Sequence, residues 1–462
     1  MDRRELLGWL GAAAGVGLAG CGGSRPSTPV SDRTPPPVSP DPPERIRWSR
    51  PETVAAAWEL ESVTNLAVAG ADTDGDRPID DLLERHATDG TLLYLPSGEY
   101  RLEESFALAG ADTRIGLLGD GATIVPPQGN DQVLFGFGYP DPLASVRVRG
   151  LTFDFSAANT GGRPIFAAAD DLVELRDVAV EGVVDVPQDL VRLDVTSPTG
   201  HGIVDRLSLP DGSTEPGVTG CEVGDTNHGD VTFRDCRIEG FPDNGLYADP
   251  PEGSVRVEGG FYRNNGVAGV RITTSDPSVV RGAHVRCDDA DAVGENMRGI
   301  RLRGGHDQLV EDCLVELFAV PSSDGAITVA SELESATIRN CRLRVDADGV
   351  NAIRVKTPNR GAGGAVRRGP FTFENVQISG AAAGGAAIQA SGRRNCTFRG
   401  LSIHQTGANR DGIATTNVEG KLVNTCVSVT SDPLAFSDSR IERRNVQLKT
   451  LPAHCPGTDV GW

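Results

Sequence analysis

A six-residue pattern that recurs through the second half of the chain constrains its fold most strongly. The pattern is apolar–x–(Asp, Asn or Gly)–small–x–apolar, and it begins at residues 233, 257, 280, 310, 338, 373 and 398. The steps between these starts are 24, 23, 30, 28, 35 and 25 residues. A period of this length indicates a solenoid, in which each repeat forms one coil that stacks on the last.

Between these hexapeptides lies a second short apolar alternation, which is usually opened by glycine. It is written GLYA, GVRI, GIRL, AITV, AIRV, AIQA and GIATT, beginning at residues 245, 269, 299, 326, 352, 387 and 412. Each period therefore holds two or three short strands and no amphipathic run as long as a helix. We predict an all-β fold, a single-stranded right-handed parallel β-helix, in which the Asp, Asn or Gly of each hexapeptide adopts a left-handed turn conformation.

The residue before each of these turns alternates in charge. The seven residues in question are Arg234, Glu258, Arg281, Glu311, Arg339, Glu374 and Arg399. Neighbouring strands of a parallel stack lie about 4.8 Å apart, so opposite charges would face each other at every step. We interpret the series as a structural charge ladder and not as a catalytic array.

The N-terminal part of the solenoid is expected to carry a cap. Residues 72–102 combine a short helical pattern near 78–87 with a first strand. A stacked solenoid leaves open ends that can pair with other chains, so we expect this helix to cover the N-terminal end. The segment resembles the start of pectin lyase-like β-helices, and this resemblance, which covers most of residues 60–450, implies the same fold. We place an N-terminal cap at 46–90, the β-helix at 91–445 and a C-terminal tail at 446–462.

Residues 1–21 are expected to be a targeting signal and not part of the fold. Arg3 and Arg4 precede a short apolar run and the sequence LAGC, which ends at Cys21. This order resembles a Tat-type lipoprotein signal, which implies export and a lipid on Cys21; the alternative is ordinary signal cleavage with an incidental cysteine. Residues 22–45 are rich in Pro, Ser and Thr, which predicts a disordered tether. We expect a protein anchored at the outer face of the cell membrane through the Cys21 lipid alone.

The chain is strongly acidic, with 64 Asp and Glu against 44 Lys and Arg and a net charge of −20. Lysine occurs only at positions 356, 421 and 449. This composition resembles that of proteins from salt-loving archaea, in which concentrated salt screens self-repulsion. The acidity argues against nucleic acid as a partner, and an anionic ligand would need a local basic patch.

The cysteines predict core packing and one candidate cross-link. Cys236, Cys313, Cys341 and Cys426 fall on the inward position after a turn, where a small apolar side chain fits. Disulfides are compatible with export, and Cys426 with Cys455 is a candidate C-terminal pair, although the spacing leaves the pairing open. No CxxC pair or His–Cys cluster suggests a metal site, so we assign no metal and no cofactor.

One stretch of the alternation gathers positive charge. In AIRVKT, beginning at residue 352, the phase that turns Ile353 and Val355 inward turns Arg354 and Lys356 outward. The same phase predicts a first outward row of Tyr247, Arg271, Arg301, Thr328, Arg354 and Gln389. It predicts a second row of Asp249, Thr273, Arg303, Ala330, Lys356 and Ser391. Arginine binds carboxylate or sulfate through two parallel hydrogen bonds, so the basic side chains, with Tyr247, would bind an acidic polysaccharide; the alternative is a solvated strand surface.

The segment from Asn351 onward, NAIRVKTPNRGAGGAVRRGPFTFENVQISG, resembles the Arg-Ile-Lys region of polygalacturonase-type glycoside hydrolases. The resemblance implies that Arg354 and Lys356 contact a substrate carboxylate. The catalytic positions of that family do not match. Where it carries paired aspartates, an Asn-Thr-Asp step and a His-Gly step, this chain has Met297, Arg298 and Gly299, then Gly266, Val267 and Ala268, and Ser323 to Ala326.

Two other carboxylates, Asp324 and Glu295, are the candidates for catalysis that remain. Hydrolysis with inversion needs one carboxylic acid and one carboxylate, whereas β-elimination on a uronate would use a basic residue beside a neutralised carboxylate. An arginine pair near Asp324 would keep it ionised. The sequence thus leaves three hypotheses: a surface-anchored protein that contacts an acidic polysaccharide, a polysaccharide lyase or glycoside hydrolase, and a purely structural envelope lipoprotein. It does not indicate an oligomeric state.

Overall fold

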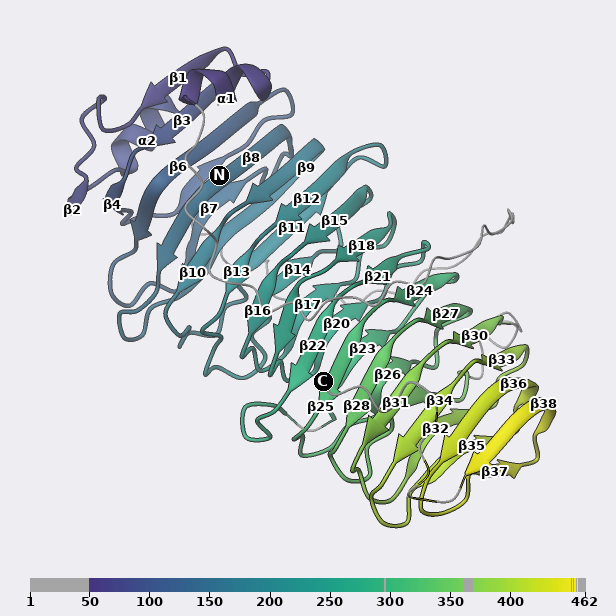
Figure 1. The fold of residues 1–462 in the computed structure, drawn as a ribbon. Helices are drawn as coiled ribbons and strands as arrows, with labels where there is room; N and C mark the ends of the chain where they lie inside the picture. Colours follow the sequence, from purple (N-terminus) through teal and green to yellow (C-terminus); the bar gives the residue numbers. More distant parts are fainter. Residues whose placement is uncertain are drawn as a thin grey trace. The chain divides into compact units, whose positions relative to one another are not determined.

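The computed structural model describes residues 50–294, 296–359, 369–449, 451, 453 and 455, all within the compact unit Val38–Trp462. Every strand pair in it is parallel, and the coils wind as a right-handed β-helix with three faces (Figure 1). The predicted fold class is therefore confirmed. Cys21, the arginine pair and the tether at 22–45 lie outside the described residues. None of the helices that the structure describes is long and apolar enough to cross a membrane.

The first face, called here the strip face, carries the outward rows predicted above. Its strands are β5 (Phe106–Leu108), β7 (Val133–Phe137), the first part of β9 (Arg163–Arg176), β11 (Val191–Val195), β14 (Cys221–Val223), β17 (Asn244–Ala248), β20 (Ala268–Ile272), β23 (Arg298–Leu302), β26 (Gly325–Val329), β29 (Ile353–Val355), β32 (Ala386–Ser391), β35 (Asp411–Thr416) and β37 (Leu434–Ser437).

The second face, the ladder face, carries the alternating charges. Its strands are β1 (Ser62–Asn65), β3 (Thr91–Leu95), the first parts of β6 (Arg114–Val125) and β8 (Leu143–Asp154), the end of β9, β12 (His201–Asp205), β15 (Asp230–Arg234), β18 (Val255–Glu258), β21 (Val279–Arg281), β24 (Gln308–Glu311), β27 (Ala336–Arg339), β30 (Phe371–Glu374), β33 (Cys396–Arg399) and the first parts of β36 (Glu419–Ser428) and β38 (Arg440–Lys449).

The third face closes each coil. Its strands are β2 (Asp74–Pro78), β4 (Gly98–Arg101), the ends of β6 and β8, β10 (Ala179–Glu181), β13 (Ser208–Leu209), β16 (Arg237–Glu239), β19 (Phe261–Arg263), β22 (His284–Cys287), β25 (Leu314–Leu317), β28 (Arg342–Val345), β31 (Gln377–Gly380), β34 (Ser402–Gln405) and the ends of β36 and β38.

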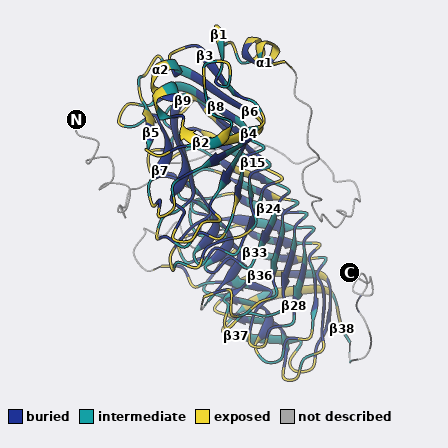
Figure 2. Ribbon diagram, turned by 90° about the vertical axis from the view of Figure 1, so that its left-hand side faces the viewer, coloured by how far each residue is buried: buried dark blue, intermediate teal, exposed yellow. Residues whose placement is uncertain are grey.

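Apolar columns fill the space between the faces. On the strip face, one fully buried column consists of Leu246, Val270, Ile300, Ile327, Ile353, Ile388 and Ile413. Buried residues, dark blue in Figure 2, continue from coil to coil between β15 and β36. Because strand side chains alternate in direction, this buried column fixes its neighbours in sequence as outward-facing.

The predicted charge ladder is confirmed at every step. The register pairs Arg234 with Glu258, Glu258 with Arg281, Arg281 with Glu311, Glu311 with Arg339, Arg339 with Glu374 and Glu374 with Arg399. Arg339 Nε donates a 2.6 Å hydrogen bond to Glu311. Burial alone would raise the pKa of Glu311, but the hydrogen bonds from Arg281 and Arg339 outweigh it and lower that pKa.

The turns adopt the predicted left-handed conformation, with φ between 47° and 71°. The residues concerned are Asp235, Gly259, Gly282, Asp312, Asn340, Asn375 and Gly400. Asp, Asn and Gly tolerate this backbone region far better than other residues do. The turn residue therefore sets where each strand of the ladder face ends.

Two short helices cover the N-terminal coils. The predicted capping helix is α2 (Asp80–His86), which buries Leu83, together with the preceding Ile79, in the main core. A second helix, α1 (Pro51–Ala57), was not predicted, although it begins with a proline and continues with three alanines, which favour a helix start and a helix interior. It packs Val54 and Ala55 against outward-facing Leu92 and Leu118, and so covers the outside of the first coils.

The cysteines lie in the core. Cys236, Cys313 and Cys341 are fully buried at the predicted inward positions, and Cys426 is joined to Cys455 in a disulfide, which confirms the candidate pair. Burial raises the pKa of Cys236 to about 12. A thiol that stays protonated is a poor nucleophile, so this cysteine acts as a packing residue.

Candidate functional site

The first outward row has the predicted register. Tyr247 pairs with Arg271, Arg271 with Arg301, Arg301 with Thr328, Thr328 with Arg354 and Arg354 with Gln389. The second row continues the same ladder, because the backbone N–H groups of Thr273, Arg303 and Lys356 donate to the preceding coil. We call the basic residues of the two rows, Arg271, Arg301, Arg303, Arg354 and Lys356, the cationic strip.

At the N-terminal end of the strip, three side chains form a connected group. The guanidinium of Arg271 lies 4.2 Å from the centre of the Tyr247 ring, and its Nη2 donates to the tyrosine hydroxyl at 3.3 Å. That hydroxyl in turn donates to the Asp249 carboxylate. Burial, together with this hydrogen bond, raises the pKa of Tyr247 to about 12, so the phenol keeps its proton at neutral pH.

Arg301 stands in the middle of the strip among like charges. Within the described part of the chain, no carboxylate forms an ion pair with it. Burial, together with the positive charges of Arg298, Arg271 and Arg303, lowers the pKa of Arg301 to about 10, and the more distant charge of Glu332 opposes this shift only in part. A guanidinium held beside other cations with no carboxylate partner is a site that an anion would stabilise.

Asp324 is held by two cations. Nε and Nη2 of Arg298 donate to its Oδ2 at 3.0 and 2.9 Å, and Nζ of Lys356 lies 2.5 Å from the same oxygen. Burial would raise the pKa of Asp324, but the hydrogen bonds from Lys356 and Arg298 outweigh it and lower that pKa. The sequence predicted an arginine pair beside Asp324; in the structure the carboxylate is instead held by Arg298 and Lys356, and neither Arg301 nor Arg354 forms an ion pair with it.

Arg298 is the site residue that sequence reasoning missed. In the sequence, Arg298 was noted only because it occupies a position at which the polygalacturonase-type family carries an aspartate. In the structure, it is buried against Asp324. The strand register could have identified it, because Arg298 pairs with Gly325, the residue that follows Asp324. Asn351 also faces this group, since its Nδ2 donates to the backbone carbonyl of Asp324 at 3.0 Å. The second candidate catalytic residue, Glu295, lies outside the described residues.

Several buried polar atoms of the two rows have no hydrogen-bond partner in the described part of the chain. They are Arg271 Nε, Thr273 Oγ1, Thr328 Oγ1 and Arg354 Nη1. Thr328 is fully buried although it belongs to an outward row, and its neighbours in register are Arg301 and Arg354. Other described coils also hold unpaired buried polar atoms, such as Nε and Nη1 of Arg163. Because buried polar groups are nearly always paired in folded proteins, the unpaired donors of the strip make it a candidate binding surface.

Upstream on the same row, the positive charge is balanced. Arg192 Nε lies 3.0 Å from Asp194, its Nη1 lies 3.5 Å from Glu222, and its Nη2 lies 2.6 Å from Asp225. Burial would lower the pKa of Arg192, but these carboxylates outweigh it and raise that pKa. The shift is opposite to that of Arg301, so unbalanced positive charge is a property of the strip and not of every arginine on this face.

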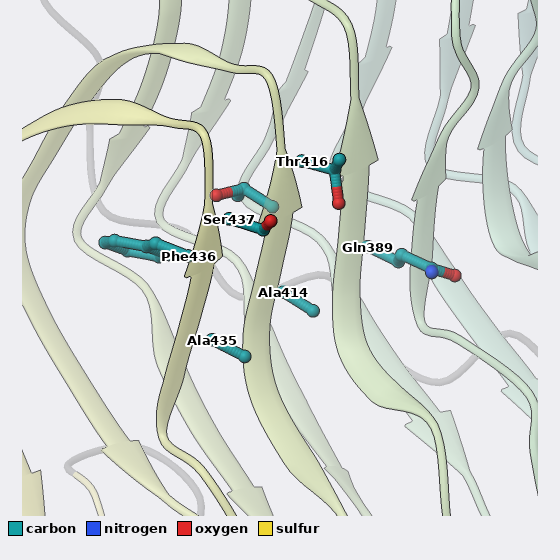
Figure 3. A pocket seen from close by; sticks show the side chains of 7 residues that line it. Gln389, Ala414, Thr416, Ala435, Phe436 and Ser437 are labelled. Atoms are coloured by element: carbon teal, nitrogen blue, oxygen red, sulfur yellow. The ribbon is translucent and has the colours of Figure 1, made fainter.

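Downstream, the strip borders a shallow depression of about 340 Å³ (Figure 3). It is lined by Gln389, Ala414, Thr415, Thr416, Ala435, Phe436 and Ser437, from β32, β35 and β37. Gln389 is the register neighbour of Arg354, so the depression begins one coil beyond the last arginine. Across the described residues, no group of three or more His, Cys, Asp or Glu side chains is placed to hold a metal ion.

The stacked coils place the chain in the class of right-handed parallel β-helix proteins. No family model and no curated protein matches it. Similar solved structures include the Streptococcus pneumoniae surface adhesin PfbA, at 14% identity and a TM-score of 0.44 over 84% of this chain and 100% of that chain. A mannuronan C-5 epimerase A-module from Azotobacter vinelandii matches at 16% identity and 0.40 over 83% and 99%. A family 28 exopolygalacturonase from Yersinia enterocolitica matches at 12% and 0.35 over 85% and 79%.

Proposed function

We propose that the cationic strip binds an acidic polysaccharide lying across the coils. The observation that carries the proposal is the half-buried cluster of Arg271, Arg301 and Arg354, whose guanidinium groups lack a carboxylate partner among the described residues of a chain with net charge −20. The pKa of Arg354, like that of Arg301, is lowered by burial, and only Asp324 opposes the shift. Bound carboxylate or sulfate groups would supply the missing counter-charge.

The spacing of the strip favours a polymer over a single small anion. Arg271 and Arg301 lie on adjacent coils, which are about 4.8 Å apart, and Arg354 lies two coils beyond Arg301. A chain that crosses the strands would meet cations on the coils of Arg271, Arg301 and Arg354, and would pass Thr328 on the coil between the last two. Nucleic acid also carries repeated charge, but Arg271 covers one face of the Tyr247 ring, and the net charge of −20 would repel a long polyanion outside the strip.

The test compares the double variant Arg301→Ala/Arg354→Ala with Arg440→Ala/Arg444→Ala, which removes the same charge from exposed positions on β38. Charge-assisted hydrogen bonds contribute about 1.5–3 kcal/mol each, so the strip variant should bind an acidic polysaccharide at least about tenfold more weakly, while the β38 variant should bind like the wild type. Calorimetry at one fixed salt concentration measures both. Equal affinities for the wild type and the strip variant would sink the proposal.

A second candidate function is catalysis on the same polymer, and the linked group of Tyr247, Asp249 and Arg271 favours it. The protonated phenol can donate a proton to a leaving oxygen, and the nearby arginine can hold a substrate carboxylate. Asp324, the candidate from the sequence, precedes the strand three coils from Tyr247, about 14 Å away, so it does not act on the same bond as this phenol.

The test of catalysis uses Tyr247→Phe, which keeps the ring beneath Arg271 and removes the hydroxyl. If the protein is a lyase or hydrolase, the wild type releases unsaturated products or new reducing ends, and Tyr247→Phe loses this activity while it still binds. If the wild type binds the polymer and releases no product, it is a binding protein, and the proposal of catalysis is wrong.

We further propose that a lipid on Cys21 holds the domain at the outer face of the cell membrane, on the sequence pattern alone. Cys21→Ser should then move the protein from the membrane fraction to the medium. A variant that stays membrane-bound would remove the lipid anchor from the proposal.

A further inference from the structure

The depression beside the strip continues the two outward rows and differs from them in chemistry. Past Arg354, the first row runs through Gln389 to Ala414 and Ala435. The second row runs from Ser391 to Thr416 and Ser437. A ligand that lies across the strip and extends toward the C-terminal coils therefore enters the depression directly.

No lining residue of the depression is charged. The small side chains of Ala414 and Ala435 leave the space, and Figure 3 shows Ala414 on the strand next to the longer side chain of Gln389 and Ala435 one strand further on. The volume of about 340 Å³ lies at the lower end of the range of small-molecule sites, which is roughly 300–1,000 Å³. The depression can therefore hold a small unit of a ligand but supplies no counter-charge for an acidic one.

The polar groups of the depression suit hydroxyl groups. The side chains of Gln389, Thr416 and Ser437 form no hydrogen bond with any residue that the structure describes, and Thr416 and Ser437 are exposed. Hydroxyl and amide groups both donate and accept, so they can pair with the hydroxyl groups of a sugar in either direction. A carboxylate or sulfate only accepts, and would lose water here without gaining a cation.

We propose that this depression is a subsite for an uncharged sugar unit, adjacent to acidic units held by the strip. The inference rests on the proposed function and makes it more specific: the ligand is a heteropolysaccharide in which neutral and acidic sugars are linked to each other. A purely acidic polymer would occupy the strip and leave the depression unused.

The test fills the depression with Ala414→Trp and uses two probes, hyaluronan, in which uronate alternates with an uncharged amino sugar, and polygalacturonate, in which every unit is acidic. Ala107→Trp is the matched control, because Ala107 occupies the same outward row on the N-terminal coil β5. Thr416→Val is a second variant that removes one exposed hydroxyl with little change of shape.

We expect Ala414→Trp to weaken hyaluronan binding at least tenfold and to leave polygalacturonate binding within twofold. Thr416→Val should weaken hyaluronan binding severalfold, and Ala107→Trp should change neither affinity. If both depression variants bind hyaluronan like the wild type while the strip variant loses both polymers, the neutral subsite is overturned and the proposed function stands. If the wild type binds neither polymer, both are overturned.

Discussion

At the residue scale, arginines of this chain serve two opposite purposes. Arg393 is fully buried, and its Nε, Nη1 and Nη2 donate to the backbone carbonyls of Lys356, Leu333 and Ala330 at 2.9, 2.8 and 2.7 Å. Its N–H donors therefore stabilise the fold. Arg301 lies next to Arg271 in the register and has no such acceptors in the described coils. Its charge is therefore available to a ligand.

Asp324 gives a prediction at the same scale. Its folded-state pKa is lowered by Lys356 and Arg298, so the ionised carboxyl stabilises the fold above the ordinary aspartate pKa of 3.8, and this stabilisation is lost as the pH falls through the lower folded value. The free energy of unfolding of Asp324→Asn should therefore differ from that of the wild type most at pH 6, and the difference should shrink toward pH 3.

Urea unfolding at several pH values measures this difference. Asp432→Asn is the matched control, because Asp432 is exposed and its side chain forms no ion pair with the described residues; it should cost far less stability at pH 6. A loss in Asp324→Asn that stays constant from pH 6 to pH 3 would contradict the ion pair as its cause.

At the element scale, the last strand, β38, shows how the end of a stack of parallel strands is protected. One inward column of the ladder face runs through Phe373, Phe398 and Leu422, and its register partner on β38 is Arg443. A charged residue at an inward position of a terminal strand hinders pairing with another chain. On the third face, the inward column through Ile403 and Val427 ends in Leu448, which is 53% exposed, so apolar surface does lie at this end.

Arg443→Leu should therefore promote association through β38. The substitution continues the apolar column of Phe373, Phe398 and Leu422 onto the terminal strand, and we expect a larger, concentration-dependent mass in sedimentation than for the wild type. Arg444→Leu changes the adjacent position, which is paired with Val423 outside the core, and serves as the control. Equal masses for Arg443→Leu and the wild type across concentrations would show that this arginine does not prevent association.

At the scale of the β-helix, the strip face divides into three zones along the coils. Arg192 is neutralised by its carboxylate neighbours, Arg271, Arg301 and Arg354 form no ion pair with a carboxylate of the described coils, and the residues that line the depression are uncharged. The parallel register keeps each outward position aligned from coil to coil. A different residue type at that position in successive coils therefore changes the chemistry of the surface along the axis of the β-helix. The solenoid thus presents an ordered series of environments to a long ligand.

The sequence by itself determined the repeat, the turns, the ladder and the outward rows. Strand side chains alternate strictly, and Asn, Asp and Gly fix the turns, so a pattern in the chain such as AIRV converts directly into a direction in space. Only the tertiary structure decided which long side chains meet. That Arg298 and Lys356 hold Asp324, that Thr328 is buried between two arginines, that α1 covers Leu92 and Leu118, and that Ala414 lines a depression depend on how neighbouring coils pack. Those contacts join residues that are tens of positions apart. They depend on the conformation of long, flexible side chains, which no repeating pattern in the sequence encodes.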